Sequence, residues 1–293
     1  MYRKHVVTYL SLGLIWGSSF VVLRDVVAAF GWAASVSFRA LLTAGVLYAI
    51  ARIQKKKLNF GRTRDLVVVG STTVALQLSG LGIGTPRIGT ALCAIFVAAI
   101  PLYTMVIGQM WGIEHITRLG RFGVLVGMVG MVLLVGFPSA PIDTDFIVGC
   151  IAMLIGTIAA AFGSNYTHKH QSHMGSIERT IGAFFFGGLL TLPLVIAFPV
   201  PTTPRPIDYV GLLALATIFS GLAYVLYFAL IKAVGPTVAI SSEFLVTLVA
   251  VLIGAGFLGE ALSALQIVGG VVIIASCMLV LDLIPRSRRG SVG

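Results

Sequence analysis

A succession of long apolar segments with very few charges constrains this chain more than any other feature. A bilayer has a hydrocarbon core about 30 Å thick, and a helix needs roughly 17–25 apolar residues to cross it. Ten such segments lie near residues 6–29, 33–52, 65–84, 87–111, 119–137, 146–168, 176–198, 208–232, 236–258 and 264–283. Because the connections between them are short, the sequence predicts an all-α polytopic membrane protein with ten transmembrane helices and no separate soluble domain.

The composition supports lipid as the solvent for most of the chain. Hydrophobic residues make up 58% and charged residues only 10%, whereas soluble domains carry about 25% charged residues. Three cysteines, Cys93, Cys150 and Cys277, each lie inside an apolar run. We therefore interpret them as small buried hydrophobic side chains and expect neither a disulfide framework nor a metal site from them.

The basic residues predict how the chain is oriented in the membrane. Lys and Arg outside the spans gather on the cytoplasmic side of membrane proteins. With the amino terminus inside and the spans alternating, sixteen of the 20 Lys and Arg residues fall on the cytoplasmic side. Arg24, Arg87 and Arg205 fall on the far side, and Arg39 lies within a span. The asymmetry predicts a multi-pass inner-membrane protein with both termini in the cytoplasm.

Similarity at one constant offset divides the chain into two halves. Glu114 and Glu260 each close an apolar run six residues after a glycine, and they lie 146 residues apart. The same offset pairs Trp-Gly-Ser-Ser-Phe at 16–20 with Phe-Gly-Ser-Asn-Tyr at 162–166. It also pairs Gly89 with Gly235, Leu102 with Leu248, Leu119 with Leu265 and Gly123 with Gly269. Matches of glycine, serine and glutamate at a single offset indicate an internal repeat.

Five spans in each half predict that the second half enters the membrane in the opposite sense. The loop after Glu114 carries Arg118 and Arg121, as a cytoplasmic loop should, while the equivalent positions after Glu260 are apolar. We expect one repeat over residues 1–140, an inverted repeat over 141–285 and a basic cytoplasmic tail at 286–293. Inverted repeats around a shared central site are a transporter architecture that supports alternating access.

Particular residues resemble a known family. Leu-Ile-Trp-Gly-Ser-Ser-Phe at 14–20 is similar to the opening of EamA-type proteins of the drug/metabolite transporter (DMT) superfamily. The stretch from Gly-Pro-Thr at 235–237 to Gly-Glu at 259–260, followed by Gln-Ile-Val-Gly-Gly at 266–270, resembles that family's fourth and fifth helices. The first half departs from the pattern, with Gly-Ile-Glu at 112–114 in place of Gly-Glu. The resemblance covers nearly the whole chain and is greatest to the YddG-type aromatic amino acid exporters. It implies ten helices, a central cavity and export of amino acids, amines or drugs.

Polar and glycine-rich positions inside the spans are the first candidates for a substrate site. Such sites lie near the membrane midplane, often where helices are broken or rich in Gly and Pro. Polar side chains inside lipid usually face the protein interior or a water-filled cavity, although Ser can also bond to its own helix carbonyls. Gly80 serves either as a thin cavity wall or in close helix packing. The polar candidates are Ser19, Gln77, Asn165 and Ser242.

Glu243 is the one acidic residue well inside a predicted span. A charge at the helix centre costs about 2.5–3.5 kcal/mol on insertion scales. It is therefore a candidate for proton coupling or for recognition of a substrate ammonium, the alternative being a structural hydrogen bond. Arg39 becomes its partner only if the fold brings the second span close.

Aromatic side chains supply candidates for a lipophilic pocket that accepts rings and cations. Tyr224 and Tyr227 lie three residues apart and share a helix face. The alternative for each aromatic residue is ordinary helix packing or an interfacial belt. The aromatic candidates for the substrate site are Trp16, Tyr103, Tyr166, Tyr224 and Tyr227.

The sequence lacks the motifs that several other classes of protein require. The sequence contains no Walker A phosphate loop, no recognisable catalytic constellation and no strong metal motif. The net charge of +10 is explained by one-sided loops rather than by nucleic-acid binding. We therefore expect a protein that is not an enzyme and needs no cofactor. Its expected partners are membrane lipids and a small-molecule substrate, and we expect it to act as a monomer.

The function that the sequence favours is secondary transport by alternating access. The predicted substrates are amino acids, aromatic or hydrophobic, and related small metabolites, exported across the inner membrane. One alternative is an antiporter for sugar-nucleotide or phosphorylated metabolites, which would require more basic residues inside the spans than Arg39. A membrane-embedded enzyme or receptor is an alternative from another class.

Overall fold

Helices account for all the regular structure in the residues that the computed structural model describes, namely 3–113, 116–135, 143–201, 203–258 and 263–280. In chain order they are α1 (Arg3–Ile53), α2 (Thr63–Val69), η1 (Gly70–Leu76), α3 (Gln77–Ala98), α4 (Ile100–Met110), α5 (Arg118–Val135), α6 (Thr144–His170), α7 (Ser176–Thr191), α8 (Leu194–Ala197), α9 (Pro206–Ala214), η2 (Leu215–Leu222), α10 (Ala223–Val234), α11 (Pro236–Ile240), α12 (Ser242–Leu258) and α13 (Ala264–Val280). The segments η1 and η2 are π-helical. Glu114, Glu260 and the predicted tail at 286–293 lie outside the described residues.

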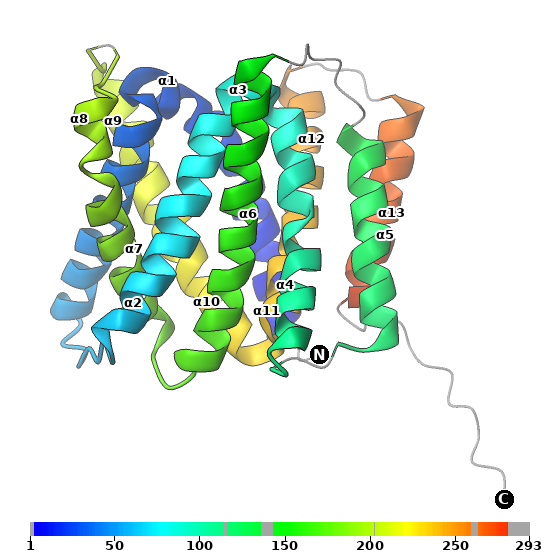
Figure 1. Cartoon of the computed structure of the whole chain (residues 1–293), viewed down its shortest axis with the longest axis horizontal. Helices are drawn as coiled ribbons and strands as arrows, with labels where there is room; N and C mark the ends of the chain where they lie inside the picture. The colour runs from blue at the N-terminus through cyan, green and yellow to red at the C-terminus, as the bar shows by residue number, and fades with distance from the viewer. Residues whose placement is uncertain (1–2, 114–115, 136–142, 202, 259–262, 281–293) are drawn as a thin grey trace, which may run out of the picture.

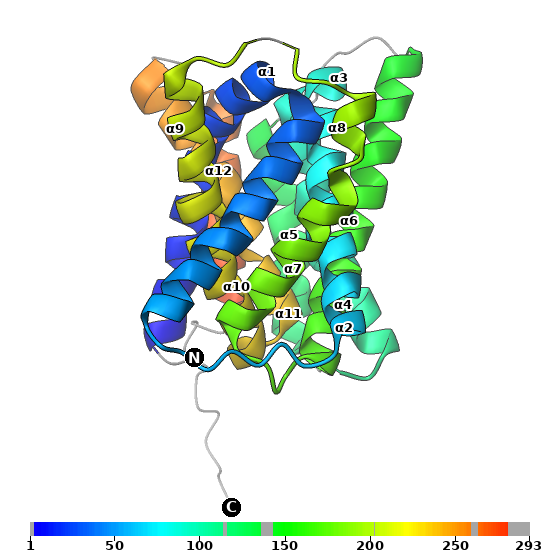
Figure 2. The same ribbon diagram turned by 90° about the vertical axis from the view of Figure 1, so that its left-hand side faces the viewer.

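The expected break between the first two apolar segments falls inside α1. Gly31, in the middle of α1, has φ 74° and ψ 165°, so two helices meet there at a kink. That conformation is accessible to glycine and disfavoured for residues with a Cβ. The chain therefore turns back at the upper edge of the molecule, and the two ends of α1 both lie at the lower edge (Figures 1 and 2).

Helical structure does not stop at residues 85–86, between the spans predicted at 65–84 and 87–111. It continues through Pro86 to Ala98, and α4 begins at Ile100. A proline removes one N–H donor without ending a membrane helix, because neighbouring helices and side chains can satisfy the freed backbone group. Figure 1 shows α2 rising from the lower edge, α3 reaching the upper edge and α4 lying in the lower half of the descending part.

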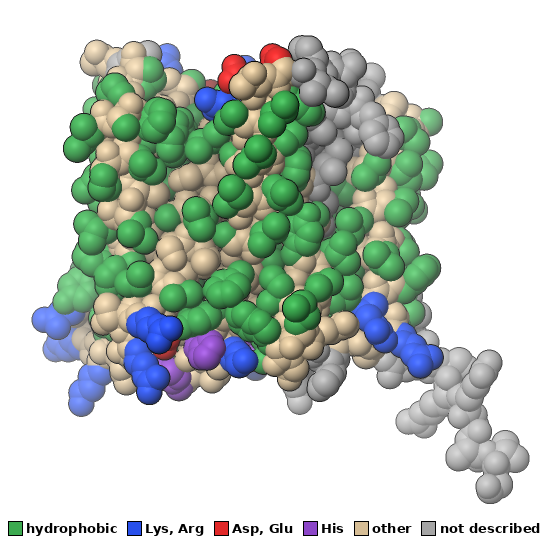
Figure 3. Space-filling model, viewed as in Figure 1, with side chains coloured by type: hydrophobic (Ala, Val, Ile, Leu, Met, Phe, Trp, Pro, Cys, Tyr) green, Lys and Arg blue, Asp and Glu red, His purple; other side chains and the backbone are tan. Residues whose placement is uncertain are grey.

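The surface matches a bilayer in both length and polarity. Five helical segments are long and apolar enough to cross a membrane, and three shorter apolar helices accompany them among the described residues. Large apolar side chains such as Ile147, Ile151 and Ile158 on α6 are 44–52% exposed. Hydrophobic side chains cover the middle of the molecule, whereas Lys and Arg gather at its lower edge (Figure 3). The fold is that of a polytopic α-helical membrane protein.

Helix pairing follows a consistent pattern across the two halves of the chain. The helix α5 packs against α13, the part of α1 before Gly31 packs against α12, and α6 packs against α4. The helix α6 also packs along α3, while α1 packs along η2 and α10. The two π-helical segments lie at Gly70–Leu76 and Leu215–Leu222. Their last residues are 146 positions apart (222 − 76) and their first residues are 145 positions apart (215 − 70).

Candidate substrate-binding cavity

A cavity of about 530 Å³ lies between α1, α3, η2, α10 and α12. The two legs of α1, before and after Gly31, both contribute to its wall. Its polar lining residues are Ser19, Arg24, Ser35, Arg39, Gln77, Thr85, Ser220, Tyr224 and Glu243. A volume of this size suits a small metabolite with its bound water, since ligand pockets span roughly 300–1,000 Å³.

The cavity extends from mid-depth toward the upper edge of the molecule. Trp16 lies near the middle of the first leg of α1, and Arg24 lies about 12 Å further up the same helix. Trp32, directly after the kink in α1, and Pro86, inside α3, also line the cavity. Tyr9 lies about 10 Å below Trp16 on α1 and is fully buried. The lining therefore extends upward from mid-depth, and the lower end of the cavity, here called its floor, lies above buried side chains such as Tyr9.

Aromatic rings form that floor. The ring of Trp16 lies 5.4 Å from Tyr224 and 5.4 Å from Tyr227, measured between ring centroids. Phe184 packs edge-on against Tyr224 at 4.7 Å. The indole Nε1 of Trp16 donates to the Phe219 carbonyl at 3.1 Å, which fixes the ring against η2. Packing of this kind favours fixed positions of the aromatic side chains, and the rings of Trp16 and Tyr224 contribute apolar surface to the cavity lining.

Two opposite charges line the same cavity without neutralising each other. Glu243 is 8% exposed and lies in the first turn of α12, directly after the break in the helix at Ser241. A carboxylate is favoured there by the helix dipole. Arg39 is half-buried, and its Nε has no hydrogen-bond partner. Among the described residues neither side chain forms an ion pair, so each is available to a bound molecule.

Five of the eleven predicted site residues line this cavity: Trp16, Ser19, Gln77, Tyr224 and Glu243. They come from four different segments, and the fold brings them together. Ser19 donates its hydroxyl to the Trp16 carbonyl at 2.6 Å, so part of its hydrogen-bonding capacity is used within α1.

Three of the remaining predicted residues are engaged in buried hydrogen bonds outside the cavity wall. Asn165 donates through Nδ2 to the carbonyls of Thr104 and Ala161, each at 3.0 Å. The Tyr227 hydroxyl lies 2.6 Å from Ser164 Oγ, beneath the floor. The Ser242 hydroxyl donates to the Ala239 carbonyl at 2.9 Å and so bridges the helix break.

The other three predicted residues also lie away from the cavity lining. Tyr103 is half-buried and packs against the main hydrophobic core. The Tyr166 hydroxyl donates to Asp65 Oδ1 at 2.7 Å. Gly80 permits close helix packing, because a Cβ there would come within 2.7 Å of the Ala152 carbonyl oxygen. Of the two roles that the sequence left open for Gly80, the geometry matches the packing role.

Arg39 is the lining residue that the sequence candidates omitted despite a readable signal. A guanidinium inside a membrane span is costly and usually marks a functional site. Its place in the cavity depends on the kink at Gly31, which brings the second leg of α1 beside the first. No group of three His, Cys, Asp or Glu side chains suited to a metal occurs among the described residues.

The helical fold, the lipid-compatible surface and a charged, aromatic cavity between the helices define a membrane transporter. Residues 147–282 match the model of the EamA-like transporter family. It is 27% identical to protein PecM of Dickeya dadantii, over 95% of this chain and 92% of that protein. It is also 27% identical to the uncharacterized inner membrane transporter YedA of Escherichia coli K12, over 92% of this chain and 88% of that protein. A solved crystal structure superposes with a TM-score of 0.80 over 97% of this chain and 99% of that chain, at 14% identity, which shows a shared fold.

Proposed function

We propose that this chain is a secondary transporter that exports aromatic or hydrophobic amino acids and related small metabolites across the inner membrane. The observation that carries the proposal is that Glu243 and Arg39 both line one cavity whose floor is aromatic. A zwitterionic amino acid has an ammonium for the carboxylate, a carboxylate for the guanidinium and a side chain for the rings of Trp16 and Tyr224. Charge-assisted hydrogen bonds are roughly twice as strong as neutral ones, so both ends of the substrate contribute to recognition.

Alternating access between two inverted five-helix halves is the mechanism that we infer. The pairing of α5 with α13, and the π-helical segments at nearly equivalent positions, support an internal two-fold relation in the membrane plane. In such a transporter the halves exchange conformations around a fixed central site. An upper opening of the cavity would close as a lower one opens, carrying the bound substrate from one side to the other.

The basic lower edge supports an orientation in which that edge faces the cytoplasm. Both termini then lie in the cytoplasm, and the part of the cavity lined by Arg24 and Trp32 lies toward the outer face. This arrangement corresponds to the state from which an exporter releases its substrate. We propose that the transporter works as a monomer and performs no chemistry on its substrate, because the cavity contains groups for binding and no nucleophile paired with a base.

Transport should be measurable with the purified protein in liposomes. We expect saturable counterflow of radiolabelled phenylalanine, leucine and tryptophan, with and without an imposed pH gradient, because the cavity combines charged ends with an aromatic floor. Sugar nucleotides and phosphorylated metabolites form the comparison set. Amino-acid flux no greater than that of protein-free liposomes, or flux restricted to the phosphorylated compounds, would contradict the proposal.

The inverted repeat predicts that two equivalent loops lie on opposite faces of the membrane. In a variant lacking Cys93, Cys150 and Cys277, Thr117→Cys and Ser263→Cys should react with a membrane-impermeant maleimide from opposite sides. The reason is that α4 ends at the lower edge while α13 begins at the upper edge (Figure 1). Labelling of intact cells and of inverted vesicles measures the two sides, and reaction of both cysteines from the same side would rule out the inversion.

A further inference from the structure

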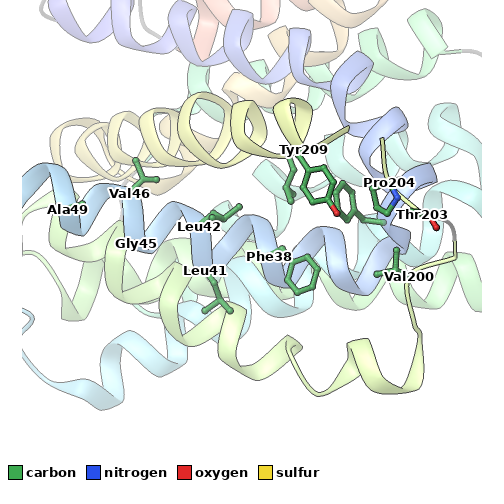
Figure 4. A pocket seen from close by; sticks show the side chains of 12 residues that line it. Phe38, Leu41, Leu42, Gly45, Val46, Ala49, Val200, Thr203, Pro204 and Tyr209 are labelled. Atoms are coloured by element: carbon green, nitrogen blue, oxygen red, sulfur yellow. The ribbon is translucent and has the colours of Figure 1, made fainter. Parts of the chain in front are cut away.

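A second cavity lies on the outer face of the helical bundle, away from the proposed transport site. It has a volume of about 940 Å³ and runs between the second leg of α1 and α9. Phe38, Leu41, Leu42 and Val46 of α1 line it together with Tyr209 and Leu212 of α9, and Figure 4 shows Tyr209 on the side opposite α1. Since its α1 and α9 walls are apolar and the surrounding surface faces lipid, its natural occupant is a hydrocarbon chain rather than a polar solute.

Gly45 keeps this apolar groove open. A Cβ built on Gly45 would meet nothing within 4 Å, so no neighbouring helix requires a glycine there. Most glycines inside the other helices differ, because an added Cβ would press against packed atoms, as at Gly17, Gly163 and Gly187. Glycine in the middle of a helix is destabilising relative to alanine, and its effect at this position is to leave space in the groove.

A basic pocket lies one helical turn beyond the lower end of the groove on α1. Ala49 lines the groove, and Arg52 lies three residues further on the same face of α1. The pocket has a volume of about 580 Å³, and Tyr48 and Phe60 frame its basic side chains. Those basic residues are Arg52, Lys55, Lys56 and Lys57. The connection that holds the lysines follows the lower edge of the molecule (Figure 2), where phospholipid headgroups of one leaflet lie.

The turn after α1 holds these lysines in place. The Lys55 N–H donates to the Arg52 carbonyl at 3.0 Å, and the Lys56 N–H donates to the Ala51 carbonyl at 2.9 Å. These bonds end α1 and direct the following residues along the membrane surface. No acidic side chain lines the pocket, so its four positive charges are open to an anion.

We propose that the groove and the basic pocket together form a binding site for one anionic phospholipid. The α1 wall from Phe38 to Ala49 is about 16 Å long, which matches one leaflet of a hydrocarbon core about 30 Å thick. One acyl chain lies along the groove over Gly45, and the phosphate lies among Arg52, Lys56 and Lys57. Basic pockets beside membrane helices on the cytoplasmic side are suited to anionic headgroups. This site is separate from the transport cavity and does not depend on the proposed substrate.

Two variants test the two parts of the site by native mass spectrometry of the full-length protein with added phosphatidylglycerol or phosphatidylcholine. The wild-type protein should retain phosphatidylglycerol in preference to phosphatidylcholine. Lys56→Gln with Lys57→Gln should lower phosphatidylglycerol retention roughly fivefold for each charge removed. Gly45→Phe should fill the groove and lower retention of both lipids without changing the fold.

Matched controls separate this site from general effects of charge and size. Arg118→Gln with Arg121→Gln removes two exposed charges from the same edge, and Leu125→Phe enlarges an exposed side chain on α5. Both controls should retain phosphatidylglycerol as the wild type does. Equal loss in the charge control, unchanged retention in Gly45→Phe, or full competition by glycerol 3-phosphate would overturn the proposal. So would a dimer in lipid-free protein that Gly45→Phe abolishes, because a second copy would then be the occupant of the groove.

Discussion

Glu243→Gln should reduce amino-acid flux at least tenfold, and Arg39→Gln should do so as well. Glu243→Gln replaces a carboxylate by an amide of nearly the same size, and Arg39→Gln replaces a guanidinium by a shorter neutral amide, so each removes one charge from the cavity lining. A hydrogen bond to a charged group contributes about 1.5–3 kcal/mol, which corresponds to a factor of roughly 10 to 100. The measurement is initial counterflow of labelled phenylalanine in liposomes at matched protein content.

Substrate analogues that lack one charge should separate the two roles. Phenethylamine has the ammonium without the carboxylate, and 3-phenylpropionate has the carboxylate without the ammonium. If Glu243 binds the ammonium, then Glu243→Gln should impair transport of the amine and have little effect on the acid. Arg39→Gln should have the opposite preference.

Two charge controls on the lower edge accompany these variants. Glu178→Gln and Arg62→Gln remove charges that do not line the cavity, and both should transport phenylalanine at the wild-type rate. Wild-type flux of all three compounds through both cavity variants would refute the proposed recognition. Equal impairment of the amine and the acid by Glu243→Gln would instead favour a general structural or coupling role for this carboxylate.

The sequence could predict where helices form, because bilayer thickness sets a length that apolar runs must match. Most described residues of each predicted apolar range are helical, and the break between the first two ranges is the kink at Gly31. It could not predict that helical structure continues past Pro86, since the groups that stabilise a proline-containing helix come from elsewhere in the fold.

Which side of a helix faces the cavity could be predicted only in part. A helix that is apolar all round has no polar face to indicate its orientation. Asn165 and Gln77 were equivalent candidates in the sequence, yet Gln77 lines the cavity while Asn165 bonds to the Thr104 carbonyl. That partner is 61 residues away in the chain, so no local pattern could reveal it. Tyr224 and Tyr227 do share a helix face, but only the first reaches the cavity wall.

Arg179 shows the same difficulty for a charged residue. By position it counts as one of the basic residues at the cytoplasmic end of a span, which suggests an exposed side chain. In the structure it is only 1% exposed. Its guanidinium donates to the carbonyls of Gln171 at 2.6 Å, Met174 at 2.7 Å and Phe228 at 3.1 Å. It thereby joins the end of α6, the start of α7 and α10, and satisfies carbonyl groups that the end of a helix leaves without partners.

Arg179→Met should therefore lower the free energy of unfolding by about 3 kcal/mol, because buried carbonyl oxygens would lose charged donors. Unfolding in mixed detergent micelles, followed by tryptophan fluorescence, measures the change. Arg179→Lys should recover part of the loss, since an ammonium can donate to some of the same carbonyls. Arg118→Met, at an exposed site on the same edge, should shift stability by no more than about 0.5 kcal/mol. An Arg179→Met protein as stable as the Arg118→Met control would show that this guanidinium does not hold the three helices together.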